Sequence, residues 1–170
     1  EVTIQAPDAY WVTAPGPMEV PGGPPILANV IVNPGFETGD LSGWIPQTWT
    51  ISTTQPHSGA YDAHDVGGSG GGGGCIRQNF NPPLDSDLIS NFTFWLRQID
   101  NFGIAQVIVF HQSTGVSVGV AFTNDDNSWT FEDFSILVRP NDLVTGVHVC
   151  GFGIGSPDPD DSWLDDVTLE

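Results

Sequence analysis

Carboxylates near both ends of the chain are the residues best suited to chemistry, and the chemistry they suit is cation binding. Asp165 lies in the closing stretch "WLDDVTLE", whose alternating apolar residues predict a β-strand. Alternation along that strand would place Asp165 on one face with Trp163, Val167 and Leu169, and we expect this face to point into a core. A buried carboxylate must be paired or must hold a metal ion. Glu37, in "NPGFETGDLSGW", is the matching acid at the other end of the sequence.

The charge balance of the chain limits its partners. The 170 residues include 21 acids and three basic residues, for a formal charge of −18. Nucleic acid is disfavoured because phosphate binding needs a cationic face, and an anionic membrane surface is disfavoured for the same reason. No apolar stretch approaches the roughly 18 residues that a membrane span needs, so we expect no membrane insertion. Clustered carboxylates favour a multivalent cation, which relieves their mutual repulsion.

Short alternating segments fill most of the sequence, and these are the elements that must position the acids. Apolar residues at helical spacing with helix caps are nearly absent. Strands are predicted at 26–33, 75–80, 91–99, 104–112, 116–122, 129–138, 144–154 and 162–170, most of them separated by turn residues. Eight or more short strands without a helix indicate a single all-β sandwich or barrel over residues 26–170.

Residues 1–25 form an N-terminal arm of different composition. The arm holds six of the fourteen prolines, which keep a chain extended and block helix formation. Its first fourteen residues nevertheless alternate, with an apolar stripe interrupted only by Asp8; the stripe comprises Val2, Ile4, Ala6, Tyr10, Val12 and Ala14. Such a stripe needs an apolar cover. The arm could add a strand to the chain's own sheet, could be donated to a neighbouring molecule, or could be disordered.

Two cysteines, Cys75 and Cys150, form an even count. The acidic charge, the high glycine content and the absence of lysine suggest an extracellular, secreted protein, in which the two would pair as a disulfide. The alternative is a pair of buried free thiols. A disulfide of this loop length would stabilise the fold by roughly 4–5 kcal/mol in the chain-entropy model.

Four motifs in order resemble one family. They are "NPGFETGDLSGW" (33–44), "HSGAY" (57–61), "IRQNF" (76–80) and "WLDDVTL" (163–169). Together they resemble jelly-roll carbohydrate-binding modules of the family 4/9/22 type over about residues 27–170. The resemblance implies an antiparallel jelly-roll β-sandwich of two sheets, with a structural calcium ion near the junction of the first and last strands.

The calcium site implied by the resemblance falls on Glu37 and Asp165. Calcium takes six to eight oxygen ligands, many of them backbone carbonyls of glycine-rich loops. In this interpretation Gly35 and Phe36 turn the chain, Phe36 anchors it in the core, and Glu37 faces the ion. The alternative is that Glu37 and Asp165 are hydrogen-bonded loop acids.

Carbohydrate-binding modules hold sugars by stacking them on aromatic rings flanked by polar side chains. In "NFTFWLRQ" (91–98), Trp95 and Arg97 lie on the face opposite Phe92, Phe94 and Leu96, which resembles a sugar platform. They are the candidate residues for binding a glycan or polysaccharide. The alternative is that a loop or the arm covers Trp95.

Two functions from different classes follow. The first is a non-catalytic extracellular module that binds glycans, because no spacing of acids or histidines specifies a catalytic site. The second is a structural subunit of an extracellular filament or surface layer, self-associating by strand exchange through the arm residues Val2, Ile4, Tyr10 and Val12.

Overall fold

The computed structural model describes residues 28–66, 73–99, 104–123, 127–152 and 161–170. Within these ranges strands dominate, and the helical turns are two short 3-10 segments, η1 (Ser86–Leu88) and η2 (Ser135–Leu137). The all-β prediction is therefore confirmed. The N-terminal arm lies outside the described residues, so the predictions for Val2, Ile4, Tyr10 and Val12 remain predictions.

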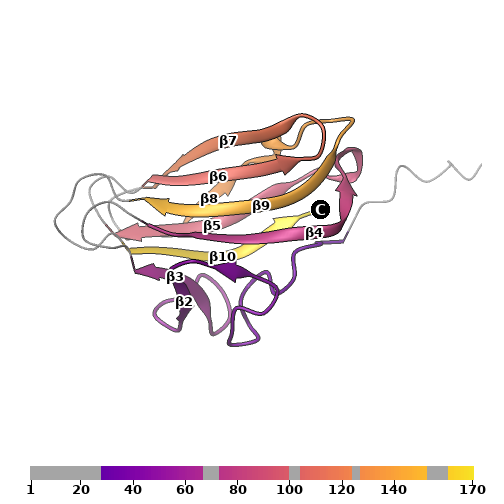
Figure 1. The fold of residues 1–170 in the computed structure, drawn as a ribbon. Coiled ribbons are helices and arrows are strands. Elements are labelled where there is room, and N and C mark those ends of the chain that lie inside the picture. The colour runs from indigo at the N-terminus through magenta and orange to yellow at the C-terminus, as the bar shows by residue number, and fades with distance from the viewer. Residues whose placement is uncertain (1–27, 67–72, 100–103, 124–126, 153–160) are drawn as a thin grey trace, which may run out of the picture.

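The strands form two antiparallel five-stranded sheets that face each other (Figure 1). Sheet A has the order β1-β4-β9-β6-β7 and comprises β1 (Ile45–Pro46), β4 (Cys75–Asp85), β9 (Leu143–Phe152), β6 (Ile104–His111) and β7 (Gly115–Phe122). Sheet B has the order β2-β3-β10-β5-β8 and comprises β2 (Trp49–Ser52), β3 (Asp62–Val66), β10 (Asp161–Leu169), β5 (Phe92–Ile99) and β8 (Thr130–Asp133). The predicted jelly-roll β-sandwich is thus confirmed.

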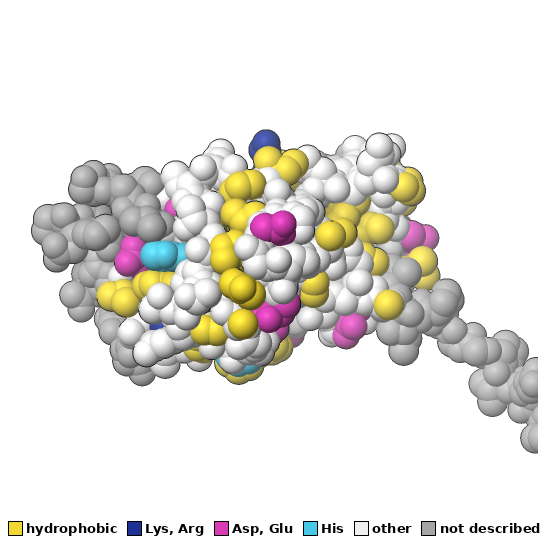
Figure 2. All heavy atoms as spheres, turned by 90° about the horizontal axis from the view of Figure 1, so that it is seen from below, with side chains coloured by type: hydrophobic (Ala, Val, Ile, Leu, Met, Phe, Trp, Pro, Cys, Tyr) yellow, Lys and Arg dark blue, Asp and Glu magenta, His cyan; other side chains and the backbone are white. Residues whose placement is uncertain are grey.

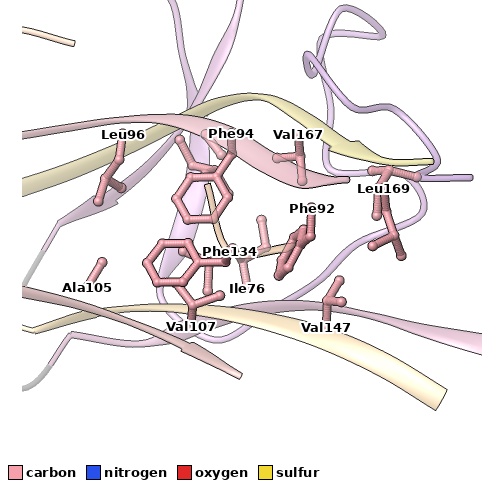
Figure 3. Packing of buried hydrophobic residues seen from close by; sticks show 14 of the residues in the cluster. Ile76, Phe92, Phe94, Leu96, Ala105, Val107, Phe134, Val147, Val167 and Leu169 are labelled. Atoms are coloured by element: carbon pink, nitrogen blue, oxygen red, sulfur yellow. The ribbon is translucent and has the colours of Figure 1, made fainter. Parts of the chain in front are cut away.

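The core lies between the two sheets and follows the predicted alternation. Phe92, Phe94 and Leu96 of β5 are fully buried on its inner face. Phe94 stacks on Phe134 with ring centroids 5.6 Å apart, and Val107 of sheet A faces this pair (Figure 3). Burying one such side chain stabilises a fold by roughly 1.5–3 kcal/mol, so this face fixes which side of β5 turns outward.

The predicted disulfide between the two cysteines is confirmed. Cys75 of β4 and Cys150 of β9 lie directly opposite each other in neighbouring strands of sheet A and are bonded. The bond joins positions 75 residues apart in the sequence.

The predicted strand at 26–33 is wrong over its described part, 28–33, which forms no ladder. The side chain of Asn29 replaces strand pairing there: its amide donates to Val167 O at 2.9 Å and its carbonyl accepts from Leu169 N at 3.1 Å. Val30 N also donates to Leu169 O at 2.9 Å. The beginning of the domain is therefore tied to the end of β10 largely through one asparagine.

Candidate functional site

The outer face of sheet B carries the aromatic and charged residues that the sequence singled out. Trp95 and Arg97 of β5 point away from the buried Leu96. In the adjacent β10, Trp163 pairs with Arg97 and Asp165 pairs with Trp95. Residues directly opposite each other in a sheet share a face. All four side chains therefore lie on the outer face of sheet B.

The orientation of Asp165 differs from the one that alternation predicts. The register of β10 shifts after Asp165, and Asp166 has a positive φ of 49°, which marks a β-bulge. Beyond the bulge Val167 and Leu169 point into the core, whereas Asp165 points to the opposite face. The prediction that Asp165 shares a face with Val167 and Leu169 is wrong because one extra residue reverses the alternation.

Asp165 is nevertheless completely buried, with 0% of its surface exposed. Its carboxylate accepts hydrogen bonds from Ser58 N at 3.0 Å and from Asp166 N at 2.8 Å. Burial raises the pKa of Asp165 to about 6, and the neighbouring charges of Asp166 and Asp62 act in the same direction. A buried carboxylate with a raised pKa is one that a cation would stabilise.

We expect the metal-free protein to gain stability on acidification because of Asp165. A carboxyl whose pKa is about 6 when folded and near its ordinary value when unfolded binds more protons in the folded state between those values. The free energy of unfolding should therefore rise by about 1 kcal/mol between pH 7 and pH 5 from this group. Urea unfolding at pH 7 and pH 5, in the presence of a metal chelator, would measure this change in the free energy of unfolding. The variant Asp165→Asn should lack this increment, and an unchanged pH dependence in the variant would contradict the assignment.

Three side chains form what we name the Asp165 cluster: His57, Asp165 and Asp166. His57 Nδ1 lies 2.7 Å from Asp166 Oδ2, and Ser58 Oγ donates to Asp166 Oδ1 at 2.8 Å. One possible ligand atom from each member of the cluster lies within 4.8 Å of the others. Carboxylate oxygens suit calcium, whereas the imidazole of His57 suits transition metals better.

Glu37 binds residues 60–61, which follow closely on the segment 57–58 at the Asp165 cluster. Its carboxylate is exposed and accepts hydrogen bonds from Ala60 N and Tyr61 N, at 3.0 and 3.1 Å. Phe36, at a φ of 56°, is fully buried and packs on Trp44, so it anchors the turn as the sequence suggested. Glu37 and Asp165 thus both bind the segment 58–61. Their joint binding of an ion remains a prediction.

Glycine at position 35 keeps the acids close to the backbone. A Cβ atom there would lie 3.2 Å from Asp166 Oδ1, 3.5 Å from Asp165 Oδ1 and 3.8 Å from Glu37 Cγ. The first of these distances is tighter than an ordinary carbon–oxygen contact. Two carboxylates, those of Asp165 and Asp166, therefore lie close to this backbone position, whereas Glu37 approaches it only with its Cγ atom.

Arg97 is buried, with only 2% of its surface exposed. Its guanidinium donates to Gln55 Oε1 at 2.9 Å and to Thr54 O at 2.8 Å. Its Cζ atom lies 4.1 Å from the ring centroid of Trp163 and 5.2 Å from that of Trp129. Arg97 therefore holds the segment 54–55 against sheet B. Contact between Arg97 and a ligand remains a prediction.

Arg97 and Asp62 form a buried pair of opposite charges. The carboxylate of Asp62, fully buried, lies 4.0 Å from the guanidinium. Burial lowers the pKa of Arg97 and raises the pKa of Asp62, while the attraction between the two opposes each shift. Each charge therefore offsets part of the cost of burying the other.

Four rings on the same face form what we name the aromatic patch: His57, Trp95, Trp129 and Phe131. His57 stacks on Trp95 with centroids 3.9 Å apart, and its edge meets Trp129 at 5.8 Å. Trp95 meets Phe131 edge-on at 5.4 Å. Phe131 is 53% exposed, whereas the other three rings are half-buried. The patch thus has an exposed ring, Phe131, beside three partly buried rings. His57, in the loop before β3, covers one face of Trp95, which agrees with the alternative prediction that a loop covers this residue.

Sequence reasoning did not select the other members of the patch as a group. Trp129 and Phe131 alternate on either side of Thr130, so their common face could have been read from period-two spacing. No local signal places His57 on Trp95, because they are brought together by the path of the loop before β3.

A separate acidic pocket of about 310 Å³ shares no residue with the patch. It is lined by Asp85, Asp87, Gln112, Ser113, Asn141, Asp142 and Leu143. The carboxylate of Asp142 accepts hydrogen bonds from the backbone and hydroxyl groups of Ser113 and Thr114. These bonds hold the pKa of Asp142 well below its usual range, so this carboxylate already has its hydrogen-bond donors within the protein.

The visible surface is acidic rather than basic. Figure 2 shows acidic side chains dispersed among uncharged and hydrophobic ones, with little basic surface in view. Among the described residues, no helix has the length and hydrophobicity to cross a bilayer. An uncharged ligand therefore suits this surface better than an anionic one.

Comparisons with known proteins define the class of the fold. No protein-family model matches the sequence, and no curated protein matches it. Among solved structures, TmCBM61 in complex with β-1,4-galactotriose is 19% identical, covers 85% of this chain and 99% of its own, and superposes with a TM-score of 0.64. The CBM22-1 xylan-binding domain of Paenibacillus barcinonensis Xyn10C is 9% identical over 80% of this chain and 90% of its own, with a TM-score of 0.56.

A third structure comes from a larger protein. The enzymatically active domain of bacteriophage CBA120 tailspike protein 4 is 14% identical over 84% of this chain but only 21% of its own, with a TM-score of 0.60. The chain has the jelly-roll β-sandwich of carbohydrate-binding modules, which confirms the fold implied by the four sequence motifs. At these identities the likeness concerns the fold, and function must be argued from the site.

Proposed function

We propose that this chain is a non-catalytic, extracellular glycan-binding module whose ligand stacks on the aromatic patch. The exposed face of Phe131 beside Trp95 and Trp129 is the single observation that carries the proposal. Apolar faces of sugar rings pack on such surfaces, and nearby polar groups fix the orientation of the sugar. The fold is shared with modules solved with galactotriose or described as xylan-binding, which makes a neutral polysaccharide the ligand class to test first.

Affinity electrophoresis and calorimetry with galactan and xylan oligosaccharides would test this proposal. Replacing Phe131 with alanine should weaken binding by about tenfold, because loss of one stacking ring removes on the order of 1–1.5 kcal/mol. Phe122→Ala is the matched control, since Phe122 is 71% exposed on the opposite sheet. Equal affinities of both variants, or no binding by the folded protein in calcium, would contradict the proposal.

We further propose that a calcium ion stabilises the loop of residues 57–61, which carries His57 of the aromatic patch. The carboxylates of Asp165 and Asp166 lie next to Gly35, that of Glu37 binds the backbone of residues 60–61, and Asp165 is buried with a raised pKa. These oxygen donors fit calcium, which would neutralise their charge. His57 keeps its hydrogen bond to Asp166 in this arrangement and stacks on Trp95. Calcium would therefore order both the loop and one ring of the patch.

Thermal unfolding with and without calcium would test the ion site. At calcium concentrations a hundred times the dissociation constant, binding to the folded state should stabilise it by about 2.7 kcal/mol. Asp165→Asn should lose this calcium-dependent gain, while Asp133→Asn, at an exposed acid on β8, should retain it. A gain of equal size in both variants would show that the ion binds elsewhere. Glycan binding is measured independently, so the two proposals can fail separately.

A further inference from the structure

The edge strand β7 is uncharged and has an exposed apolar face, although the protein as a whole is acidic. It is the outermost strand of sheet A, and its eight residues, Gly115–Phe122, carry no charge. Val116, Val118, Val120 and Phe122 are between 43% and 71% exposed on the outer face. Long, uncharged, apolar edge strands are templates for pairing with a further strand. Nothing in the glycan-binding proposal accounts for this edge.

The contacts of Arg139 show which backbone groups of β7 face outward. Its guanidinium donates to Thr114 O at 2.8 Å and to Val116 O at 2.9 Å. Backbone groups alternate in direction along a strand, so those of Val118 and Val120 also point away from β6. As β7 ends its sheet, these outward groups have no strand partner in the described part of the chain.

The residues with outward backbone groups are also those with exposed apolar side chains. In an antiparallel pairing, a new strand would place its hydrogen-bonded residues opposite Val118 and Val120, with their side chains on the same face. The added strand must therefore carry apolar side chains at every second position, and its bonding residues must all have an N–H group. The residues between these positions point their backbone groups away from β7, so they do not need an N–H group for this pairing.

The N-terminal arm meets these requirements by sequence. Its apolar stripe falls on even-numbered positions, including Val2, Ile4, Tyr10 and Val12, and Pro7 falls on an odd-numbered position. Proline is tolerated where its missing N–H faces away from a sheet. With the even positions bonded to β7, the stripe continues the apolar row of Val118 and Val120. We propose that residues 2–14 of a neighbouring copy of this chain pair with β7 as a sixth strand of sheet A.

The spacer between the arm and the domain favours a neighbouring copy over the same molecule. Residues 15–25 include five prolines, a composition typical of a semi-rigid extended spacer. Residues 15–27 would span roughly 40 Å at about 3.1 Å per residue. From β10 to β7 within one sandwich the distance is only roughly 15–20 Å, given sheet and strand spacings of about 10 and 4.8 Å. A stiff spacer that exceeds the span lowers the effective concentration for pairing within one molecule.

Hydrogen exchange and mass measurements on the full-length chain test this pairing. The amides of Val118, Val120 and Phe122 should exchange at least about tenfold more slowly in wild type than in the variant Ile4→Asp/Val12→Asp. Light scattering should show wild type growing in mass with concentration, because head-to-tail contacts form open chains. The control Thr3→Asp/Thr13→Asp adds the same charge to the other face of the arm and should still assemble.

A second variant tests the same contact from the β7 side. Val120→Pro removes one outward N–H and leaves the pairing with β6 intact, so it should abolish assembly, while Val120→Thr should not. Slow exchange at Ser117, Gly119 and Ala121, which face β6, confirms folding in every variant. A wild-type monomer with unprotected outward amides would overturn the proposal, and so would protection that is independent of concentration, which indicates pairing within one molecule. Equal disruption by Thr3→Asp/Thr13→Asp would also overturn it.

Discussion

Replacing both Cys75 and Cys150 with alanine is expected to lower the free energy of unfolding by about 4–5 kcal/mol. The disulfide joins β4 and β9, neighbouring strands of sheet A, across a sequence separation of 75 residues. Removing it returns the conformational freedom of this long loop to the unfolded chain. The loss is a large share of the roughly 5–15 kcal/mol that ordinary domains possess.

Urea unfolding of the oxidised wild type, the reduced wild type and the double variant measures this effect. The reduced wild type and the double variant should unfold at similar urea concentrations, because both lack the cross-link. Reductant should leave the double variant unchanged. If reductant left the wild type unchanged as well, the disulfide would not contribute to stability in the way expected.

Replacing Arg97 with alanine is expected to cost about 3–5 kcal/mol, the range for breaking a buried charge pair. The substitution leaves the carboxylate of Asp62 buried without its nearby cation. It also frees Thr54 O and removes the guanidinium from the ring faces of Trp129 and Trp163. The segment over sheet B should therefore loosen, and glycan binding at the aromatic patch should weaken with it.

Arg139→Ala is the matched control for this substitution. The guanidinium of Arg139 donates to two backbone carbonyls, so this residue too makes two hydrogen bonds. Arg139 lies at the surface beside β7, and its replacement should therefore cost about 1 kcal/mol or less. The double variant Arg97→Met/Asp62→Asn should recover part of the lost stability, because it removes both buried charges. Equal costs for Arg97→Ala and Arg139→Ala, measured by urea unfolding, would contradict the buried-pair interpretation.

His57 connects the two proposed sites. One side of its imidazole reaches Asp166 of the Asp165 cluster, and its ring face covers Trp95 of the aromatic patch. A change in the conformation of the loop that carries His57 would therefore reposition an aromatic ring that contributes to the proposed glycan surface. Testing glycan affinity with and without calcium would separate a purely stabilising ion from one that also shapes the patch.

Local alternation was enough to predict seven of the ten described strands and most of their faces, but it missed β1, β2 and β3, and it extended β8 over the 3-10 segment η2. Phe92, Phe94 and Leu96 predicted the inner face of β5, and the same spacing placed Trp95 and Arg97 outward. Period two suffices there because every side chain in a regular strand alternates between faces. The two cysteines and the four ordered motifs likewise indicated the disulfide and the jelly-roll class from residue types and order alone.

The outer face of sheet B is completed by tertiary packing that the residue pattern does not encode locally. The bulge at Asp166 reversed the alternation that had placed Asp165 with Val167, because a single extra residue exchanges the two faces of a strand. The burial of Arg97 and the stacking of His57 on Trp95 depend on the path of residues 54–61 over the sheet. Such contacts between residues distant in sequence leave no periodic signal, since they are set by how a loop packs on a completed sheet.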